Sequence, residues 1–405
     1  MGRFIVIVLD GFGVGAMDDV HESRTKDIGA NTAYKLLASY PNRDLPTLAL
    51  LGLNNVVDCN VSRLKQNPNA NIGTINLKHQ GCDTFAGHQE LMGTLPKLPR
   101  VNPFHNSIDT IQESLEEAGY FVERVKRGEL AVLLVEQCVV IGDNLEAELG
   151  EVYNVAADLN RIEFDSLLNI GRIVRANNDV ARNIVFGGRL DATEQLIDSI
   201  EVRGECIGVN APKSKVYERG FQVAHLGYGV NHLVQVPHLL ANVDCETVLV
   251  GKVADIVENN YGVSFKGLVD TEQILSIAYQ EVDKRKHGFI CINVQETDLS
   301  GHRQDPDSYW KVLEKSDVGI AKIMQVMNDE DVLVVTADHG NDPYIGHGQH
   351  TREKVPLLVH KNGIHGVCFS ERATLADIGA SIAEYFGADL PESGESFIEP
   401  LKLFD

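Results

Sequence analysis

Phe4-Ile5-Val6-Ile7-Val8-Leu9-Asp10, near the start of the chain, is an apolar run that stops at a carboxylate. The run is too short for a secretory leader, and an aspartate stands where a cleavage site would be expected. Strands that are buried on both faces of a parallel sheet have this continuous apolar character. The run therefore predicts a buried parallel strand whose carboxyl end presents Asp10.

Other apolar runs lead to chemically active residues in the same way. The runs and the residues that follow them are 289–294 with Asp298, 332–335 with Asp338 and His339, and 248–250 with Lys252. A further strand is expected at 356–359, and helical repeats of apolar residues lie at 273–285, 309–327 and 375–385. Alternating strands and helices predict an α/β fold with a mostly parallel sheet. Ligands of such sheets bind beyond the carboxyl ends of the strands, so these residues are expected at one shared site.

The middle of the chain differs from its two ends. Strands expected at 131–135 and 183–186 alternate there with helices expected at 107–118 and 164–176, but the segment has no cluster of potential metal ligands. A proline-bearing stretch at 95–103 marks its beginning. We expect a core domain formed by residues 1–97 and 222–405, interrupted by an inserted α/β cap domain at 98–221.

Bulk composition limits the classes of partner. A chain of 405 residues favours two domains, and 43% hydrophobic with 23% charged residues is ordinary for a globular protein. The net charge of −22 argues against a nucleic-acid partner, whereas a phosphate substrate remains compatible because bound cations invert the local field. No apolar stretch has the ~18–20 residues of a membrane span. The seven cysteines are dispersed without a Cys-x-x-Cys pair, which predicts reduced thiols and a cytoplasmic location.

Four distant segments carry side chains that bind divalent cations. They are Asp10, Asp83-Thr84-Phe85-Ala86-Gly87-His88, Asp298-Leu299-Ser300-Gly301-His302, and Asp338-His339 followed by His350. Three aspartates, three histidines and one hydroxyl are enough for two metal ions beside a hydroxyl nucleophile, which is the chemistry of phosphoryl transfer. Mixed carboxylate and imidazole ligands suit Mn²⁺ or Zn²⁺, with Mg²⁺ also possible.

The Asp338-His339 pair and Thr84 also have structural interpretations. The Asp338-His339 pair could form a turn, and Thr84 could be the N-cap of a helix through 88–92, a role that is compatible with nucleophilic chemistry. Gly11-Phe12-Gly13-Val14-Gly15 has the wrong spacing for a dinucleotide-binding loop. His347 is left out of the ligand set as a solvent-facing imidazole, and Cys82 is interpreted as a bystander.

The motifs taken together resemble the phosphopentomutases of the alkaline-phosphatase superfamily. The resemblance rests on segments at both ends of the chain: Leu9–Gly15, Asp27-Ile28-Gly29-Ala30-Asn31-Thr32, residues 83–93, Gly301-His302-Arg303, residues 337–343, His350-Thr351-Arg352-Glu353 and Ala376-Asp377-Ile378-Gly379-Ala380. It implies an alkaline-phosphatase-like α/β core with an inserted α/β cap domain. It also implies that a small sugar phosphate is the substrate, with ribose 1-phosphate and ribose 5-phosphate interconverted and a sugar bisphosphate as activator.

The resemblance further implies a role for individual residues. Asp10, Thr84, Asp338 and His339 match the ligands of one metal, and Asp298, His302 and His350 match those of the second. Thr84 corresponds to the hydroxyl that carries the phosphoryl group, and Lys252 to a lysine of the substrate pocket. Arg182, in the expected cap, could bind a phosphate bidentately or lie at the surface without a role.

The chain departs from the family pattern in places that bear on its substrate. Asp298 precedes His302 by four residues, where the family has five, and Val135-Glu136-Gln137-Cys138 replaces a serine- and aspartate-rich segment of the cap. The cap change predicts a different choice of sugar. Two alternatives remain at this point: a metal-dependent phosphatase or phosphodiesterase of the same superfamily, and a non-catalytic regulatory protein that binds metal.

Overall fold

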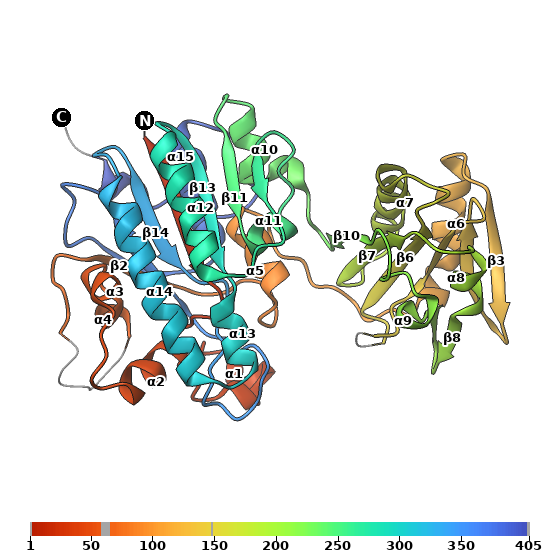
Figure 1. Cartoon of the computed structure of the whole chain (residues 1–405), viewed down its shortest axis with the longest axis horizontal. Helices are drawn as coiled ribbons and strands as arrows, with labels where there is room; N and C mark the ends of the chain where they lie inside the picture. The colour runs from red at the N-terminus through yellow and green to blue at the C-terminus, as the bar shows by residue number, and fades with distance from the viewer. Residues whose placement is uncertain (1, 58–64, 147–148, 403–405) are drawn as a thin grey trace. The chain divides into compact units, whose positions relative to one another are not determined.

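The chain forms two compact units in a computed structural model that describes residues 2–57, 65–146 and 149–402 (Figure 1). The first unit comprises Met1–Pro96 and Asn231–Asp405, and the second comprises Lys97–Val230. Cys59 lies outside the described residues, and the other six cysteines are free thiols.

An eight-stranded sheet forms the centre of the first unit, in the order β12-β11-β13-β1-β14-β15-β2-β16. Its strands are β1 Arg3–Leu9, β2 Asn71–Ile75, β11 Thr247–Val250, β12 Val263–Phe265, β13 Gly288–Val294, β14 Val332–Thr336, β15 Val355–His360 and β16 Cys368–Arg372. Every neighbouring pair is parallel except the two pairs that involve β15. The predicted α/β fold with a mostly parallel core sheet is confirmed.

The central strands place their carboxyl ends at one edge. Every residue of β1, β13 and β14 is buried, as expected for continuous apolar runs. Val8 of β1 lies opposite Asn293 of β13 and Thr336 of β14. Because the three strands run in the same direction and in this register, the residues that follow them are brought to one place.

Helices cover the sheet of the first unit. They are α1 Val20–Ser23, α2 Thr32–Ser39, α3 Pro46–Leu50, α4 Leu53–Val56, α5 Thr84–Leu91, α10 Val236–Ala241, α11 Lys252–Ile256, α12 Thr271–Lys284, α13 Glu296–His302, α14 Pro306–Gln325 and α15 Ala376–Phe386. Two of them begin earlier than the apolar repeat indicates, because aspartates cap them: Asp270 accepts the Gln273 N–H at 2.8 Å and Asp305 accepts the Ser308 N–H at 3.0 Å. No helix in the described part of the chain is long and apolar enough to cross a membrane.

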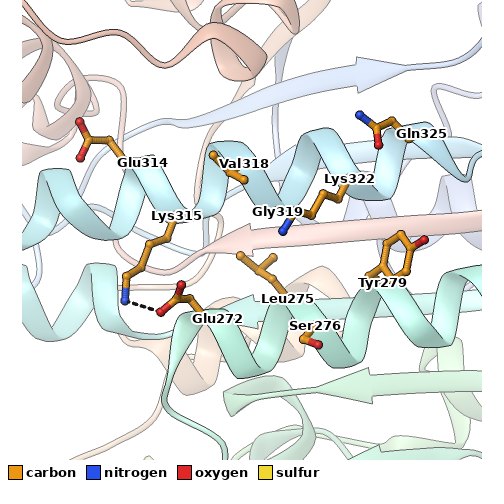
Figure 2. Close-up of a pocket in the computed structure, with 10 residues that line it drawn as sticks. All are labelled: Glu272, Leu275, Ser276, Tyr279, Glu314, Lys315, Val318, Gly319, Lys322 and Gln325. Atoms are coloured by element: carbon orange, nitrogen blue, oxygen red, sulfur yellow. Dashed lines mark ion pairs between the residues drawn. The ribbon is translucent and has the colours of Figure 1, made fainter.

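Helices α12 and α14 pack side by side on the sheet (Figure 1). Gly319 permits the close approach, since a Cβ atom there would lie 2.5 Å from Leu275. The two helices enclose a hollow of about 590 Å³ beside that contact, with an ion pair of 3.0 Å between Glu272 and Lys315 at one end (Figure 2). The residues that line this hollow include none of the candidate metal ligands.

The second unit contains a six-stranded sheet in the order β10-β7-β6-β5-β4-β3, in which only β6 and β7 are parallel neighbours. Its elements are β3 Val122–Arg127, β4 Leu130–Val135, β5 Val139–Asp143, β6 Val152–Asp158, β7 Arg182–Gly188, β8 Ile200–Arg203, β9 Cys206–Val209, β10 Gln222–Gly227, α6 Ile108–Glu117, α7 Phe164–Ala176, α8 Glu194–Asp198 and α9 Ala211–Ser214. One apolar cluster joins the sheet to α6 and α7, and another joins it to α8 and the β8–β9 hairpin. Strand β10 pairs with β7, so this unit extends beyond residue 221, where the sequence placed the end of the cap.

Candidate metal centre

All seven candidate ligands lie together at the carboxyl edge of the first unit's sheet. Asp10 directly follows β1, and Asp338 and His339 follow β14. Asp298 and His302 lie one turn apart on α13, which begins just after β13. Thr84 is the first residue of α5, and His350 precedes Thr351, whose backbone bonds to Gly340 bring the loop back beside Asp338 and His339.

Asp10, Asp338 and His339 form the first group, and all three are fully buried. His339 Nε2 lies 3.6 Å from Asp10 Oδ1 and 3.3 Å from Asp338 Oδ2. The Thr84 hydroxyl donates to Asp338 Oδ2 at 2.5 Å. The expected nucleophile is thus in direct contact with a carboxylate of this group.

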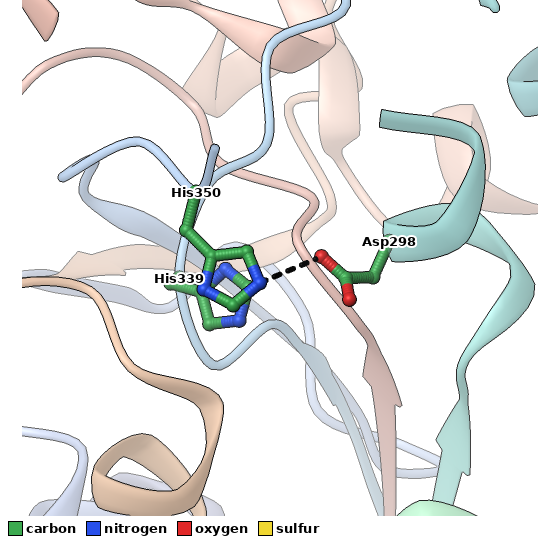
Figure 3. Close-up of side chains that lie close together, drawn as sticks. All are labelled: Asp298, His339 and His350. Carbon is green, nitrogen blue, oxygen red and sulfur yellow. Dashed lines mark ion pairs between the residues drawn. The ribbon is translucent and has the colours of Figure 1, made fainter. Parts of the chain in front are cut away.

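Asp298, His302 and His350 form the second group. His302 Nε2 lies 3.2 Å from Asp298 Oδ2, His350 Nε2 lies 3.3 Å from Asp298 Oδ1, and the two Nε2 atoms are 3.1 Å apart. His339 also reaches this group, since its ring stacks on that of His350 with centroids 3.9 Å apart (Figure 3). The two groups therefore adjoin through His339.

The imidazoles of His302, His339 and His350 are held in the same way, with Nδ1 of each ring beside a backbone carbonyl oxygen. Nδ1 of His302 lies 2.9 Å from the Gly348 carbonyl, and Nδ1 of His350 lies 2.8 Å from the Cys82 carbonyl. Nδ1 of His339 lies 3.0 Å from the Gly340 carbonyl. A carbonyl oxygen only accepts, so each ring donates from Nδ1 and carries a lone pair on Nε2 when it is neutral. This is the arrangement of metal-binding histidines, whose second nitrogen is fixed by a backbone or carboxylate acceptor.

The site carries an excess of negative charge, which favours the binding of cations. Its three carboxylates face one ammonium group, that of Lys252, whose Nζ lies 3.0 Å from Asp10 Oδ2 and 3.4 Å from Asp298 Oδ2. Burial, followed by repulsion from Asp338, raises the pKa of Asp10 to about 7. Burial lowers the pKa of His339 to about 4, which keeps this imidazole neutral at ordinary pH.

Two buried atoms of the first group have no hydrogen-bond partner among the described residues: Asp10 Oδ1 and His339 Nε2. They face each other across 3.6 Å. A buried negative oxygen and a buried lone pair are costly when nothing binds them. The residues present therefore fit divalent cations, which would bind both atoms and offset the excess of carboxylates.

Supporting residues that the sequence did not single out hold these groups in place. Asn341 Nδ2 donates to Asp298 Oδ1 at 2.8 Å, and Asn293 Nδ2 donates to Asp10 Oδ2 at 3.0 Å. His88 is fully buried, with Nδ1 3.3 Å from Asp338 Oδ2. A signal existed for Asn293, because it is the one polar side chain in the apolar strand β13.

The N-cap of α5 corrects one interpretation of Thr84. Asp83 is the capping residue, because its carboxylate accepts the Ala86 N–H at 3.0 Å. Thr84 occupies the first helical position, so its hydroxyl is available to Asp338. Gly87 lets this turn approach β14, since a Cβ atom there would lie 2.8 Å from the Asp338 carbonyl oxygen.

The remaining candidates have distinct surroundings. The Cys82 thiol donates to the His350 carbonyl at 3.3 Å, and burial raises its pKa to about 12, so it is protonated at neutral pH. His347 Nε2 lies 3.3 Å from Asp27 Oδ1, outside the two groups. Lys252 is the first residue of α11, directly after Gly251, and Arg182 is the first residue of β7 in the second unit.

Comparisons with known proteins identify the family of this chain. The family model for the Metalloenzyme superfamily matches residues 2–390. A phosphopentomutase of Symbiobacterium thermophilum is 30% identical, with 99% of this chain and 98% of the relative covered. A phosphopentomutase of Clostridioides difficile is 28% identical, with 98% and 99% covered. Among solved structures, Leishmania mexicana phosphoglycerate mutase at low cobalt concentration superposes with a TM-score of 0.46 at 12% identity, over 98% of this chain and 97% of that one.

Proposed function

We propose that this chain, which belongs to the Metalloenzyme superfamily and is a metal-dependent phosphomutase, acts on pentose phosphates by way of a phosphothreonine at Thr84. The observation that carries the proposal is the bond from the Thr84 hydroxyl to Asp338 Oδ2, a carboxylate of the candidate metal centre. A hydroxyl is a weak nucleophile unless a neighbouring group accepts its proton or a cation lowers its pKa. The contact with Asp338 supplies a group that can accept the proton. It also adjoins the residues that are suited to hold a cation.

Two divalent cations would be held by two ligand sets. Asp10, Thr84, Asp338 and His339 would hold one, and Asp298, His302 and His350 the other. Ligands of this mixed type favour Mn²⁺, with Zn²⁺ or Mg²⁺ as alternatives. When bound, such ions offset the negative charge of the phosphoryl group during transfer.

The residues of the chain account for the transfer itself. Thr84 Oγ would attack the phosphorus of a sugar bisphosphate as its proton passes to Asp338. The bond from phosphorus to the sugar oxygen would break, and that oxygen would take up a proton from water. The phosphoryl group would then rest on Thr84, at the N-terminal end of α5, where the helix dipole favours an anion. A hydroxyl of the sugar monophosphate would attack the same phosphorus and give its proton to water, the bond to Thr84 would break, and Asp338 would return its proton to Thr84 Oγ.

Two relatives are named phosphopentomutases, which supports a pentose phosphate substrate. We propose ribose 1-phosphate and ribose 5-phosphate, with a sugar bisphosphate as activator. We propose that the second unit is a cap domain that limits loss of the phosphoryl group to water. Its turn between β4 and β5 has Glu136 and Gln137 at positive φ values of 49° and 55°. Two successive positive φ values in a turn usually involve glycine or asparagine. Because Glu136 and Gln137 lie where the family has a serine- and aspartate-rich segment, this turn is a candidate for an altered choice of sugar.

The central test is phosphorylation of Thr84. After incubation of the Mn²⁺-loaded protein with ribose 1,5-bisphosphate, intact-mass analysis should show one added phosphoryl group in the wild type and none in Thr84→Ala. Thr84→Ser keeps the hydroxyl and serves as the matched control, which should still be labelled. An active Thr84→Ala variant would exclude the phosphothreonine.

The reaction type needs a separate measurement. Ribose 1-phosphate should be converted to ribose 5-phosphate without release of inorganic phosphate. Stoichiometric release of phosphate with no isomer formed would instead identify a phosphatase on the same metal centre.

A further inference from the structure

Asn293 is a fully buried polar residue of the core sheet of the first unit. It lies next to the carboxyl end of β13, where its neighbours along the strand are apolar. Its side-chain amide lies 3.0 Å from Asp10 Oδ2 and 3.0 Å from His88 Nε2. Both partners are fully buried, so the amide group joins two polar side chains that come from different elements.

The chemistry of the partners fixes the orientation of this amide. The Asp10 carboxylate accepts hydrogen bonds, so the NH₂ of Asn293 must face it. The same NH₂ group then faces His88, which leaves Nε2 of that ring as an acceptor. When neutral, His88 then carries its proton on Nδ1, which lies 2.8 Å from the Thr84 carbonyl. The opposite orientation would set the Asn293 carbonyl against the carboxylate.

These contacts form a continuous path from Asp10, a candidate metal ligand, to Thr84, the proposed nucleophile. Asp10 Oδ2 is bound by Asn293, Asn293 binds His88, and His88 binds the backbone of Thr84. Asp10 Oδ1, the other oxygen of that carboxylate, is the one left facing His339. The position of a metal ligand and the position of the nucleophile are thereby set by one amide group.

We propose that Asn293 is a positioning residue that holds Asp10 and, through His88, the first turn of α5 in a fixed mutual arrangement. This inference rests on the proposed function, because the position of Asp10 relative to α5 matters for catalysis only if Thr84 reacts beside a metal ligand. Lys252 also contacts Asp10 Oδ2, so loss of Asn293 leaves Asp10 with one bond there. His88 Nε2, in contrast, loses the only hydrogen bond that the structure gives it.

The first test is Asn293→Leu, which keeps the approximate shape and removes both hydrogen bonds. Loss of a partner of a metal ligand typically costs 10- to 100-fold in activity or metal affinity. We expect kcat to fall by about that factor with KM within about threefold, because the arrangement matters most in the transition state. A kcat within threefold of the wild type would overturn the proposal.

Thr247→Val is the matched control. Thr247 is buried on β11, the strand beside β13, and its hydroxyl has no hydrogen-bond partner among the described residues. The change likewise removes a buried polar atom from this sheet, but it touches none of the path. Its kcat should equal that of the wild type, whereas an equal loss in both variants would mean that general packing is being measured.

The second test does not depend on activity or on the stability of a variant. In ¹⁵N-labelled, Mg²⁺-loaded wild type at pH 8, the His88 ring should show the spectrum of the Nδ1–H tautomer, with assignment by its loss in His88→Gln. A proton on Nε2 would overturn the proposal even if Asn293→Leu fails to fold. If Thr84→Ala proves active while His88 has the expected tautomer, the proposed function fails and the hydrogen-bonded path stands.

Discussion

Asp143 in the second unit and Asp10 and Asp298 in the first are buried carboxylates whose partners differ in kind. In the second unit Asp143 accepts the backbone N–H groups of Phe104 at 2.9 Å and Ile207 at 2.8 Å. In the first unit Asp10 and Asp298 face side chains instead: imidazoles, amides and the ammonium group of Lys252. Backbone donors occupy both oxygens of Asp143. The side chains around Asp10 leave one of its oxygens, Oδ1, available to a cation.

The difference gives a rule for distinguishing a structural carboxylate from a functional one. Asp143 ties the entry of the second unit to its β9 strand, and its oxygens are occupied by those bonds. Asp10 retains an unpartnered oxygen directed at an unpartnered imidazole nitrogen. Burial is the same in both cases, so burial alone does not identify the site.

The largest expected effect comes from Asp298→Asn, which keeps the shape but removes one charge between two imidazoles. We expect kcat/KM to fall by about 10³-fold, or ~4 kcal/mol, because each tenfold loss corresponds to about 1.36 kcal/mol. Mn²⁺ affinity measured by calorimetry should fall as well. Asp143→Asn is the matched control, and its Mn²⁺ affinity should equal that of the wild type. If the two variants lose metal equally, the distinction between the carboxylates is wrong.

Acidification should release the metal. The bond to Asp298 raises the pKa of His302; burial lowers that of His350, but Asp298 outweighs it and the net shift is upward. Protons and cations compete for the same Nε2 atoms, so affinity is lost as the pH falls. From pH 8 to pH 6 we expect the Mn²⁺ dissociation constant to rise, because both imidazoles take up protons over this range. His347→Asn should show the same pH dependence as the wild type, and a flat profile in both would contradict the ligand assignment.

Much of the first unit could be predicted because its signals are local. The apolar runs of β1, β13 and β14 and the residues that follow them are visible in the sequence, and parallel neighbours place such residues together. Asp298 and His302 are four residues apart, which is one helical turn, so their pairing on α13 also follows from spacing. The starts of α12 and α14 were placed too late, although Asp270 and the Asp305-Pro306 pair are recognisable helix-start signals.

The rest depends on contacts between distant segments, which residue spacing along the chain does not reveal. The end of the second unit was placed too early because β10 is defined by its pairing with β7, some 40 residues earlier in the chain. The roles of Asn293 and His88 follow from side-chain directions across two elements, and spacing alone does not give these. Thr84 was considered as an N-cap because aspartate and threonine both favour that position, and only the Asp83 hydrogen bond decides between them.

Asp143→Asn should have the converse effect to Asp298→Asn. The amide of asparagine would present its NH₂ group to one of two backbone N–H donors, leaving that donor without an acceptor. An unpaired buried donor costs roughly 1–3 kcal/mol, so we expect the free energy of unfolding of the second unit to fall by about 2 kcal/mol. Urea denaturation in EDTA measures it. An unchanged midpoint would show that these bonds do not stabilise the second unit.

The smallest effect concerns Glu353, a buried carboxyl group of the first unit that accepts hydrogen bonds from Thr351, from Thr32 at the start of α2 and from the Gly15 N–H. Burial raises the pKa of Glu353 to about 7, although the Thr351 and Thr32 hydroxyls and the Thr32 N–H donate to it at 2.7 to 2.9 Å. The ordinary value for glutamate is 4.5, so between these values the folded chain holds a proton that the unfolded chain has lost. The stabilisation that this carboxyl provides is complete below about pH 4.5 and is lost as the pH rises toward 7.

Glu353→Gln removes the titration, and the threonine hydroxyls can rotate to accept from its amide. Relative to this variant, the wild type should therefore lose about 1.4 kcal/mol of unfolding free energy between pH 5 and pH 6, the slope of one proton per pH unit. Urea denaturation at the two pH values in EDTA measures the difference for the first unit. Parallel pH profiles in the two proteins would mean that Glu353 is ionised in the folded chain. It would then resemble Asp143 in one respect, as a buried group whose oxygens are occupied by fixed donors.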